Sequence, residues 1–291
     1  MLPLRSVLYL PASNRRAIDK VKTLPADAVI FDLEDAVAPD AKIEGRRNLE
    51  QAFAEGGVAS SMAVIRVNAL GSDELEADLE MVRKCSPQAL LLPKVSRPED
   101  VIAIRRSLEG NHPMSLWCMV ETAQGLLRAA EIAGVSEHEL FPLSCFVIGT
   151  NDIARETGAS MEEGRQFMVP WLMSAVLAAK ANGLAILDGV WNNFRDVHGF
   201  EREAMQGLRM GFDGKTLIHP TQVEPANRIF APAPEAVEQA RAIVTAFADP
   251  ANAGKGVINI GGRMVELLHL EMARQLLSKH EAIQRRSVLD R

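Results

Sequence analysis

Short apolar segments alternate with amphipathic segments along most of the chain, and this alternation restricts the fold more than any other feature. Each apolar segment is almost continuously apolar, as in Ala28-Val29-Ile30-Phe31, instead of alternating apolar with polar residues. Strands with this pattern are covered by helices on both faces, which is typical of parallel sheets. The apolar segments cover residues 6–10, 28–31, 63–68, 89–94, 116–120, 143–149, 185–187 and 215–218.

Eight strand–helix units of about 25–30 residues each match the count and size of a (β/α)8 TIM barrel, an α/β fold. A doubly wound parallel sheet is the structural alternative. That fold usually has fewer strands and commonly carries a Gly-rich turn after the first one. Because the sequence contains no GxGxxG motif, we predict the barrel.

A Pro-containing segment, Ala231-Pro232-Ala233-Pro234, follows the last unit and indicates a stiff linker. We therefore predict a TIM-barrel catalytic domain over residues 1–232 and a C-terminal helical extension over residues 233–291. Three further helices are expected over residues 162–181 (kinked at Pro170), 235–248 and 264–279.

Composition limits the possible partners and the compartment. The chain has 32 Lys+Arg and 38 Asp+Glu, a net charge of −6, and it has no run of basic residues, so we expect no nucleic-acid partner. Three widely spaced cysteines exclude a disulfide framework and a Cys-based zinc site. Apolar stretches fall short of the ~20 residues that span a bilayer, and the N-terminus does not match a signal peptide, so we expect a cytoplasmic protein without a membrane partner.

Carboxylates collect where the expected strands end. In a barrel, the C-terminal ends of the strands build the active site. Several carboxylates meeting there would repel one another unless some are protonated or a cation neutralises them, and oxygen ligands favour Mg²⁺ or Mn²⁺. Glu121 and Asp152 are the candidate metal ligands, although either could instead cap the following helix. The six carboxylates are Asp32, Glu34, Asp35, Glu121, Asp152 and Asp188.

Arg66 interrupts an otherwise apolar segment, and a buried arginine needs an anionic partner. That partner is either Glu34 or Glu121, or else the carboxylate of a substrate. The backbone N–H groups of Gly149-Thr150-Asn151-Asp152, at an expected helix start, could also hold a carboxylate. His219, directly before Pro220, is expected to be a structural cap more often than a catalytic base.

Motifs spread over nearly the whole length, in order, resemble those of the citrate lyase β-subunit / malyl-CoA lyase family of CoA-ester lyases. Their combination is specific for the family and weak for its individual members. The motifs are Tyr9-Leu10-Pro11-Ala12-Ser13-Asn14, Phe31-Asp32-Leu33-Glu34-Asp35-Ala36-Val37, Arg66-Val67-Asn68, Leu92-Pro93-Lys94-Val95, Val120-Glu121-Thr122-Ala123, Gly149-Thr150-Asn151-Asp152, Leu187-Asp188-Gly189-Val190, and Gly214-Lys215 through Ile218-His219-Pro220.

The resemblance implies a TIM barrel with Mg²⁺ held by Glu121 and Asp152, and with the acids after the second strand binding metal-bound waters. It also implies that a 2-oxoacid carboxylate is held by Arg66 and the backbone around Asp152. CoA would lie near the loop after the first strand. The implied site residues are Arg66, Asp32 and Glu266 (catalytic), Gly149, Thr150, Asn151 and Asp152 (substrate), Asn14, Arg15 and Lys20 (CoA), and Glu34 and Asp35 (around the metal).

The resemblance further implies trimers or hexamers, in which the tail reaches a neighbouring subunit. Glu266 stands where malyl-CoA lyases have an Asp in this tail, Asn151 replaces a common acidic residue, and Trp191 replaces a common Tyr. The function implied is a Mg²⁺-dependent carbon–carbon lyase that cleaves a 3-hydroxyacyl-CoA to a 2-oxoacid and an acyl-CoA. The alternatives are a metal-dependent pyruvate aldolase acting on free hydroxy-oxoacids, and a non-catalytic acyl-CoA-binding subunit of a complex.

Overall fold

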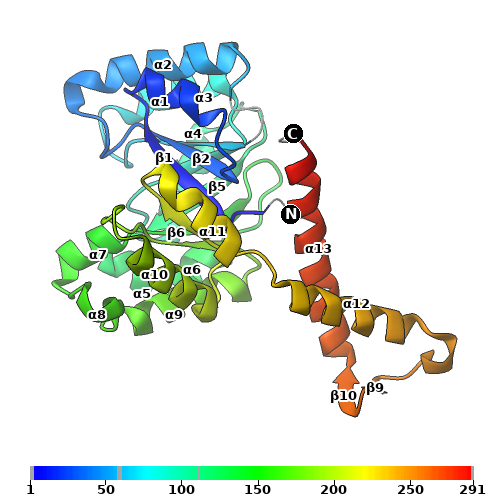
Figure 1. Ribbon diagram of the computed structural model, residues 1–291. Helices are drawn as coiled ribbons and strands as arrows, with labels where there is room; N and C mark the ends of the chain where they lie inside the picture. Colours follow the sequence, from blue (N-terminus) through cyan, green and yellow to red (C-terminus); the bar gives the residue numbers. More distant parts are fainter. Residues whose placement is uncertain (1–2, 58–60, 111, 290–291) are drawn as a thin grey trace. The chain divides into compact units, whose positions relative to one another are not determined.

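The computed structural model describes residues 3–57, 61–110 and 112–289. Contacts divide the chain into two compact units, Leu4–Ile229 and a tail from Phe230 onward. In the first unit, eight parallel strands form a closed barrel in which each strand pairs with the next and β1 pairs with β8 (Figure 1). The predicted TIM barrel is therefore confirmed. The strands are β1 (Ser6–Pro11), β2 (Ala28–Asp32), β3 (Met62–Arg66), β4 (Ala89–Leu92), β5 (Ser115–Val120), β6 (Leu143–Ile148), β7 (Ala185–Asp188) and β8 (Gly214–Leu217).

Helices connect consecutive strands and cover the outside of the barrel (Figure 1). Local side chains fix several helix starts: the Asn14 side chain accepts from the Ala17 N–H before α1, and Asp196 accepts from the Gly199 N–H before α10. The helices are α1 (Arg15–Val21), α2 (Lys42–Ala54), α3 (Leu75–Cys85), α4 (Pro98–Ser107), α5 (Ala123–Leu127), α6 (Ala129–Gly134), α7 (Thr150–Thr157), α8 (Glu162–Arg165), α9 (Val169–Ala181), α10 (Val197–Met210) and α11 (Val223–Ile229), with 3-10 turns η1 (Pro39–Ala41) and η2 (Pro220–Gln222).

The prediction of one long helix over residues 162–181 is wrong. The segment forms two helices, α8 and α9, because Gly164 and Arg165 have positive φ angles of 72° and 51° that end α8. Pro170 does not kink a helix. It lies in the first turn of α9, where backbone N–H groups have no acceptor within the helix, so its missing N–H costs no hydrogen bond. The break turns Arg165 inward, and its side chain is fully buried.

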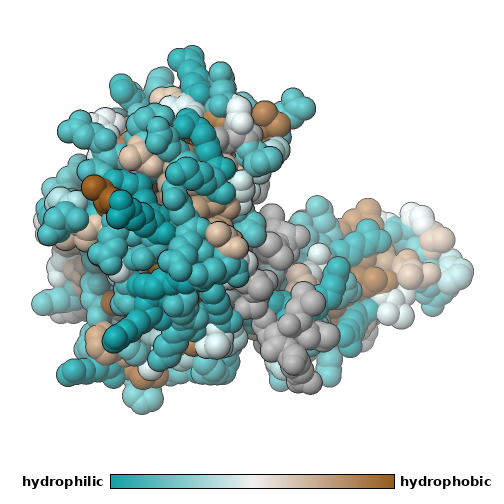
Figure 2. Space-filling model, turned by 90° about the horizontal axis from the view of Figure 1, so that it is seen from above, coloured by the Kyte–Doolittle hydropathy of each residue, from teal (hydrophilic) through white to brown (hydrophobic). Residues whose placement is uncertain are grey.

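The apolar core inside the barrel is built by every second residue of strands β1 to β7. On β2 these are Ala28 and Ile30, and on β5 they are Trp117 and Met119. Continuing the same alternation by two residues places Asp32 and Glu121 on the inner face, just beyond the apolar layers. The remaining apolar side chains lie between strands and helices, and the molecular face seen in Figure 2 is largely hydrophilic, with apolar residues scattered over it.

Asp188 has the opposite orientation, because its neighbour Leu187 occupies the inner face. The Asp188 carboxylate is fully buried and bound by Arg165 (2.6 and 2.9 Å) and by Lys215 Nζ (3.1 Å), and Lys215 also pairs with Glu203 of α10 at 2.8 Å. Burial alone would raise the pKa of Asp188, but Lys215 and Arg165 outweigh it and lower that pKa. The expectation that Asp188 joins the carboxylates of the barrel mouth is therefore wrong.

The tail contains α12 (Pro234–Ala248), η3 (Pro250–Asn252), β9 (Val257–Ile260), β10 (Arg263–Glu266) and α13 (Leu267–Leu289). The last helix was expected from residue 264, but residues 263–266 pair antiparallel with residues 257–260. Gly261 and Gly262 both have positive φ, as a tight hairpin turn requires, so this hairpin delays the helix to Leu267. No helix in the described parts of either unit is long and apolar enough to cross a membrane.

The charge cluster around Asp188 predicts an unequal response to two lysine substitutions. Lys215→Met leaves buried Asp188 and Glu203 without one of their cations, so we expect the free energy of unfolding to fall by about 3–5 kcal/mol. Lys180→Met removes the half-exposed pair with Asp213 and should cost less than about 1 kcal/mol. Urea unfolding of both variants checks this, and equal losses would contradict a supporting role for the buried cluster.

Candidate active site

A cavity of about 320 Å³ opens at the C-terminal ends of the strands. It lies where barrels place their active sites, and most of its lining comes from strand ends and the loops that follow them. The lining residues are Tyr9, Asp32, Asp35, Ala36, Arg66, Met119, Ile148, Gly149, Thr150, Asn151, Asp152, Val190, Asn192, Thr216 and Ile218. The structure thus brings together most of the residues expected at the mouth.

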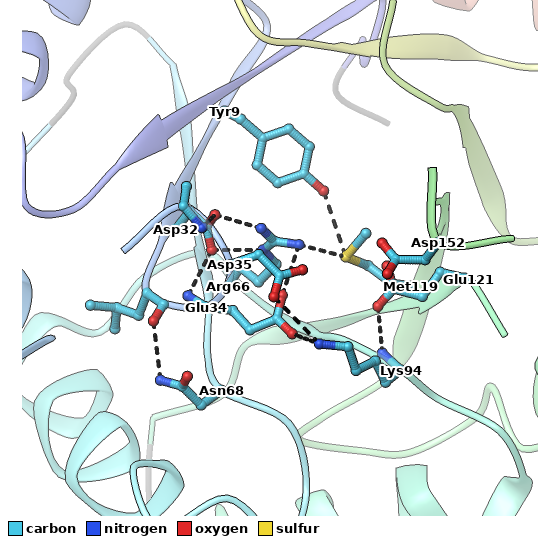
Figure 3. Close-up of polar contacts among 12 residues, drawn as sticks. Tyr9, Asp32, Glu34, Asp35, Arg66, Asn68, Lys94, Met119, Glu121 and Asp152 are labelled. Atoms are coloured by element: carbon cyan, nitrogen blue, oxygen red, sulfur yellow. Dashed lines mark hydrogen bonds and ion pairs between the residues drawn. The ribbon is translucent and has the colours of Figure 1, made fainter. Parts of the chain in front are cut away.

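Arg66 and Asp32 form a buried two-point ion pair at the base of this cavity (Figure 3). Arg66 Nε donates to Asp32 Oδ1 at 2.7 Å, and Nη2 donates to Oδ2 at 2.5 Å. Asp32 also accepts from the backbone N–H of Glu34 at 2.8 Å and of Ala36 at 3.1 Å, which fixes the loop after β2. Asp32 is the partner that the sequence argument missed, since it named only Glu34, Glu121 or a substrate for Arg66.

Glu34 lies between two cations. Its Oε2 is 3.1 Å from Arg66 Nη1, and its Oε1 accepts from Lys94 Nζ, which is also 3.5 Å from Asp35. Burial is the largest influence on the pKa of Glu34 and raises it, against the opposing effect of Arg66 and Lys94. The acids after β2 thus hold the two cations of the mouth in place.

A second layer of polar groups supports the loop that carries Glu34. Lys42 Nζ donates to the carbonyls of Leu33 (2.8 Å) and Glu34 (3.1 Å) and to Asn68 Oδ1 (2.7 Å). Asn68 donates in turn to Asp78 from both its backbone and its side chain. Sequence reasoning did not single out Lys42 or Asp78, and the only available signal was a polar residue on an otherwise buried helix face.

Glu121 is the most unusual carboxylate of the site. It is fully buried, its Oε1 accepts from the Lys94 backbone N–H at 2.7 Å, and its Oε2 has no hydrogen-bond partner. Lys94 reaches it with a left-handed backbone (φ 56°), and Gly149 lies so close that a Cβ there would be 2.6 Å from Oε2. Burial, followed by the charges of Asp152 and Glu34, raises the pKa of Glu121 to about 7.

Asp152 lies in the first turn of α7, with Oδ1 2.5 Å from Arg155. The alternative that Asp152 or Glu121 caps a helix is excluded, because Gly149 is the N-cap of α7 and Thr122 caps α5. Thr150, at the start of α7, has a buried hydroxyl without a hydrogen-bond partner. Asp152 therefore lines the cavity, and Glu121, with its unpaired buried oxygen, lies directly against Gly149 of the cavity lining.

This arrangement fits a divalent cation. Among the described residues no group of three or more His, Cys, Asp or Glu could hold a metal alone. Mg²⁺, however, is usually held by one or two carboxylates while waters and substrate oxygens complete its six ligands. The unpaired Oε2 of Glu121, whose carboxyl pKa is raised in part by the nearby charge of Asp152, matches that requirement.

The remaining predicted site residues lie outside this cavity. Asn14 caps α1, Arg15 pairs with Asp19 and Glu55, and Lys20 is exposed in the last turn of α1. Glu266 ends β10 in the tail, where its backbone N–H donates to His269 Nδ1 at 3.0 Å. Their roles toward CoA and catalysis stay predictions.

His219 is the structural cap that was expected. Its Nδ1 accepts from the Thr221 N–H at the start of η2, and its ring stacks on Phe194.

The raised pKa of Glu121 predicts a pH-dependent cost in stability. A carboxyl whose pKa is higher in the folded state destabilises that state as pH rises from about 4.5 to about 7, where it must ionise while buried. Glu121→Gln keeps an acceptor for the Lys94 N–H but carries no charge. Without divalent cations we expect it to exceed the wild type by about 1–3 kcal/mol in free energy of unfolding at pH 8.

Urea unfolding in EDTA at pH 5 and pH 8 measures this difference, which should shrink at the lower pH. Glu131→Gln, on the exposed side of α6, controls for the loss of one surface charge. A wild type more stable than Glu121→Gln at pH 8 would contradict the expected cost.

Known proteins resemble the chain over its whole length. It matches the family described as HpcH/HpaI aldolase/citrate lyase over residues 5–220, and a C–C bond lyase family of the TIM-barrel fold over residues 166–283. A (3S)-malyl-CoA thioesterase of Cereibacter sphaeroides is 46% identical, covering 97% of this chain and 96% of its own. The human mitochondrial citramalyl-CoA lyase is 32% identical, covering 95% and 85%.

Solved structures agree. The protein CitE from Mycobacterium tuberculosis, in complex with magnesium, acetoacetate and coenzyme A, superposes with a TM-score of 0.75 at 28% identity, covering 96% of this chain and 98% of that one. A citrate lyase beta subunit from the same organism, complexed with oxaloacetate and magnesium, gives a TM-score of 0.67, covering 79% and 98%. The resemblance in the motifs is thereby confirmed, and the chain belongs to the HpcH/HpaI aldolase/citrate lyase family.

Proposed function

We propose that this chain is a Mg²⁺-dependent carbon–carbon lyase that cleaves a 3-hydroxyacyl-CoA, of the malyl, citramalyl or citryl type, to a 2-oxoacid and an acyl-CoA. The observation that carries the proposal is the unpaired, buried Oε2 of Glu121, which lies against Gly149 at the edge of the cavity that Arg66 and Asp152 line. Relatives named as CoA-ester lyases, and a structure containing magnesium and oxaloacetate, support it.

In this proposal Glu121 and Asp152 hold Mg²⁺ (Mn²⁺ is an alternative), which when bound supplies a Lewis acid that polarises the oxo group. Arg66 orients the carboxylate of the oxoacid with the N–H groups that do not bind Asp32. Two of its five N–H groups are used by Asp32, which keeps the guanidinium plane fixed. The backbone at the start of α7 adds donors from Gly149, Thr150, Asn151 and Asp152.

Charge is the second argument for a cation. Glu34 and Asp35 share Lys94, Asp32 uses Arg66, and Asp152 faces the exposed Arg155. Glu121 alone has no cationic side chain bonded to its carboxylate. An oxoacid would bring a further negative charge into this cavity, so binding needs a cation near Glu121.

Thioester hydrolysis is a second candidate reaction, because the 46% identical relatives are named malyl-CoA thioesterases. The two reactions leave different products from malyl-CoA. Cleavage of the C2–C3 bond gives glyoxylate and acetyl-CoA, whereas hydrolysis gives malate and free CoA.

The proposal predicts oxoacid release from malyl-CoA, citramalyl-CoA or citryl-CoA in the presence of Mg²⁺ and none in EDTA. Glu121→Ala should abolish both turnover and Mg²⁺ binding, because it removes a buried carboxylate whose Oε2 has neither a hydrogen-bond partner nor a cationic side chain beside it. Oxoacid and free thiol are measured separately for each substrate, and Mg²⁺ binding is measured by calorimetry.

Each outcome separates the candidates. Free CoA without oxoacid identifies a thioesterase, and activity on free hydroxy-oxoacids without CoA identifies the pyruvate aldolase. Metal-independent release, or Mg²⁺ affinity retained in Glu121→Ala, would reject the metal assignment. Full activity of the purified chain would exclude a non-catalytic acyl-CoA-binding subunit.

We further propose a cytoplasmic homotrimer or hexamer in which residues 1–232 form the catalytic domain and residues 233–291 cover the site of a neighbouring subunit. In support, the tail exposes large apolar side chains at Met264 (68%), Leu268 (61%) and Met272 (58%), which is unusual for a surface without a partner. Glu266 lies among them in sequence and is the candidate proton carrier for the acyl carbon. CoA would lie along Asn14, Arg15 and Lys20.

A shared site predicts complementation between two inactive variants. Glu121→Ala lacks the barrel carboxylate and Glu266→Gln lacks the tail carboxylate, so neither alone should turn over substrate. Unfolding and refolding them together at equal amounts should restore about a quarter of wild-type activity, since that fraction of sites combines an intact barrel with an intact neighbouring tail. No recovery in mixed oligomers would contradict the role of the tail.

A further inference from the structure

Tyr9 is the only tyrosine in the chain, and its side chain lines the cavity from β1. The Arg66 guanidinium carbon lies 5.1 Å from the centre of its ring, a cation–π distance. In Figure 3 the hydroxyl points toward the centre of the mouth, on the side where Met119, Glu121 and Asp152 gather.

The hydroxyl has a weak partner. It donates to the thioether sulfur of Met119 at 3.7 Å, and Arg66 Nη1 donates to the same sulfur at 3.4 Å. A thioether is a poor acceptor, and buried tyrosine hydroxyls usually find a better one. Burial, more than the nearby carboxylates, raises the pKa of Tyr9, so the phenol is a neutral donor at physiological pH.

The cationic donors at the mouth already have partners for part of their N–H groups. Arg66 Nε and Nη2 donate to Asp32, and Lys94 Nζ donates to Glu34. Asp32, Asp35 and Asp152 contribute carboxylate oxygens, which only accept, whereas Thr150 and the backbone at the start of α7 contribute donors on the opposite strands of the rim. An anionic or carbonyl ligand next to Arg66 could therefore accept a hydrogen bond from the Tyr9 hydroxyl. Tyr9 would give up only its weak bond to the Met119 sulfur.

We propose that the Tyr9 hydroxyl donates a hydrogen bond to an oxygen of the 2-oxoacid bound beside Arg66, which makes Tyr9 a substrate-binding and specificity-determining residue. This inference rests on the proposed function. Binding exchanges a thioether acceptor for a charged or polarised oxygen, while the ring keeps its place under the guanidinium. The bond acts on the oxoacid and leaves the CoA portion untouched.

Tyr9→Phe tests the hydroxyl alone, because the ring and its stacking on Arg66 remain. We expect the Kd for pyruvate, measured by calorimetry with saturating Mg²⁺, to rise about ten- to hundredfold, as for one lost hydrogen bond to a charged group. The Kd for Mg²⁺ without oxoacid should not change. In the condensation direction the KM for the oxoacid should rise while the KM for acyl-CoA stays constant.

Met119→Leu is the matched control. It removes the sulfur but keeps the Tyr9 hydroxyl, so pyruvate should bind this variant at least ten times more tightly than it binds Tyr9→Phe. Equal weakening in both variants would show that the hydroxyl serves only its contact with the sulfur, and would overturn the proposal.

The single tyrosine also gives a direct signal. Protein labelled with 3-fluorotyrosine should show one 19F resonance that shifts when pyruvate is added to the Mg²⁺-loaded protein and does not shift with Mg²⁺ alone. A resonance that ignores pyruvate, or an unchanged pyruvate Kd in Tyr9→Phe, overturns the inference and leaves the proposed function standing. A wild type that binds no oxoacid with Mg²⁺ overturns both.

Discussion

The buried ion pair between Arg66 and Asp32 determines the positions of the other groups in the barrel mouth. Two parallel hydrogen bonds hold the guanidinium in one plane, and Asp32 uses its remaining capacity on two backbone N–H groups of the next loop. That loop carries Glu34, which contacts Arg66 again and also Lys94. A pair of this kind is costly to desolvate, and it is retained where the fixed geometry serves a purpose.

Two clusters of buried charge lie on opposite sides of the barrel wall and differ in how completely they are satisfied. The outer cluster around Asp188 has two cations and two carboxylates in mutual contact, so its charges cancel. The inner cluster has an excess of carboxylates and leaves one oxygen of Glu121 and the hydroxyl of Thr150 without hydrogen-bond partners. The outer cluster links helices to strands, whereas the inner cluster has polar atoms that remain available to bind a ligand.

The features that could be predicted from the sequence are those with a local sequence signal. Each strand lies within two residues of its expected position, because continuous apolar runs are a local signal. The mouth residues could be predicted since strand ends of a parallel barrel meet at one rim. The expectation for Asp188 failed because the argument counted strand ends and ignored the two-residue alternation, which places Leu187 inside and Asp188 outside.

Other features had no local signal. Where the helix breaks, Arg165 binds a carboxylate from a distant strand, and no periodicity within residues 162–181 records that contact. Asp32 was identified as a mouth residue but not as the partner of Arg66, since β2–β3 register is needed to pair Asp32 with Arg66. The hairpin before α13 was likewise missed because its strands are only four residues each.

Four unfavourable features converge on Glu121, and together they say more than any one of them. Lys94 adopts a left-handed backbone that costs about 1–3 kcal/mol for a residue with a side chain. Position 149 must be a glycine, because its backbone lies against the carboxylate and leaves no room for a Cβ. Burial disfavours the charged form and raises the pKa of Glu121 to about 7. The Oε2 of Glu121 also lacks a hydrogen-bond partner. A site with these features is not optimised for stability, and a cation bound to Glu121 would engage the unpaired oxygen and favour the ionised carboxylate.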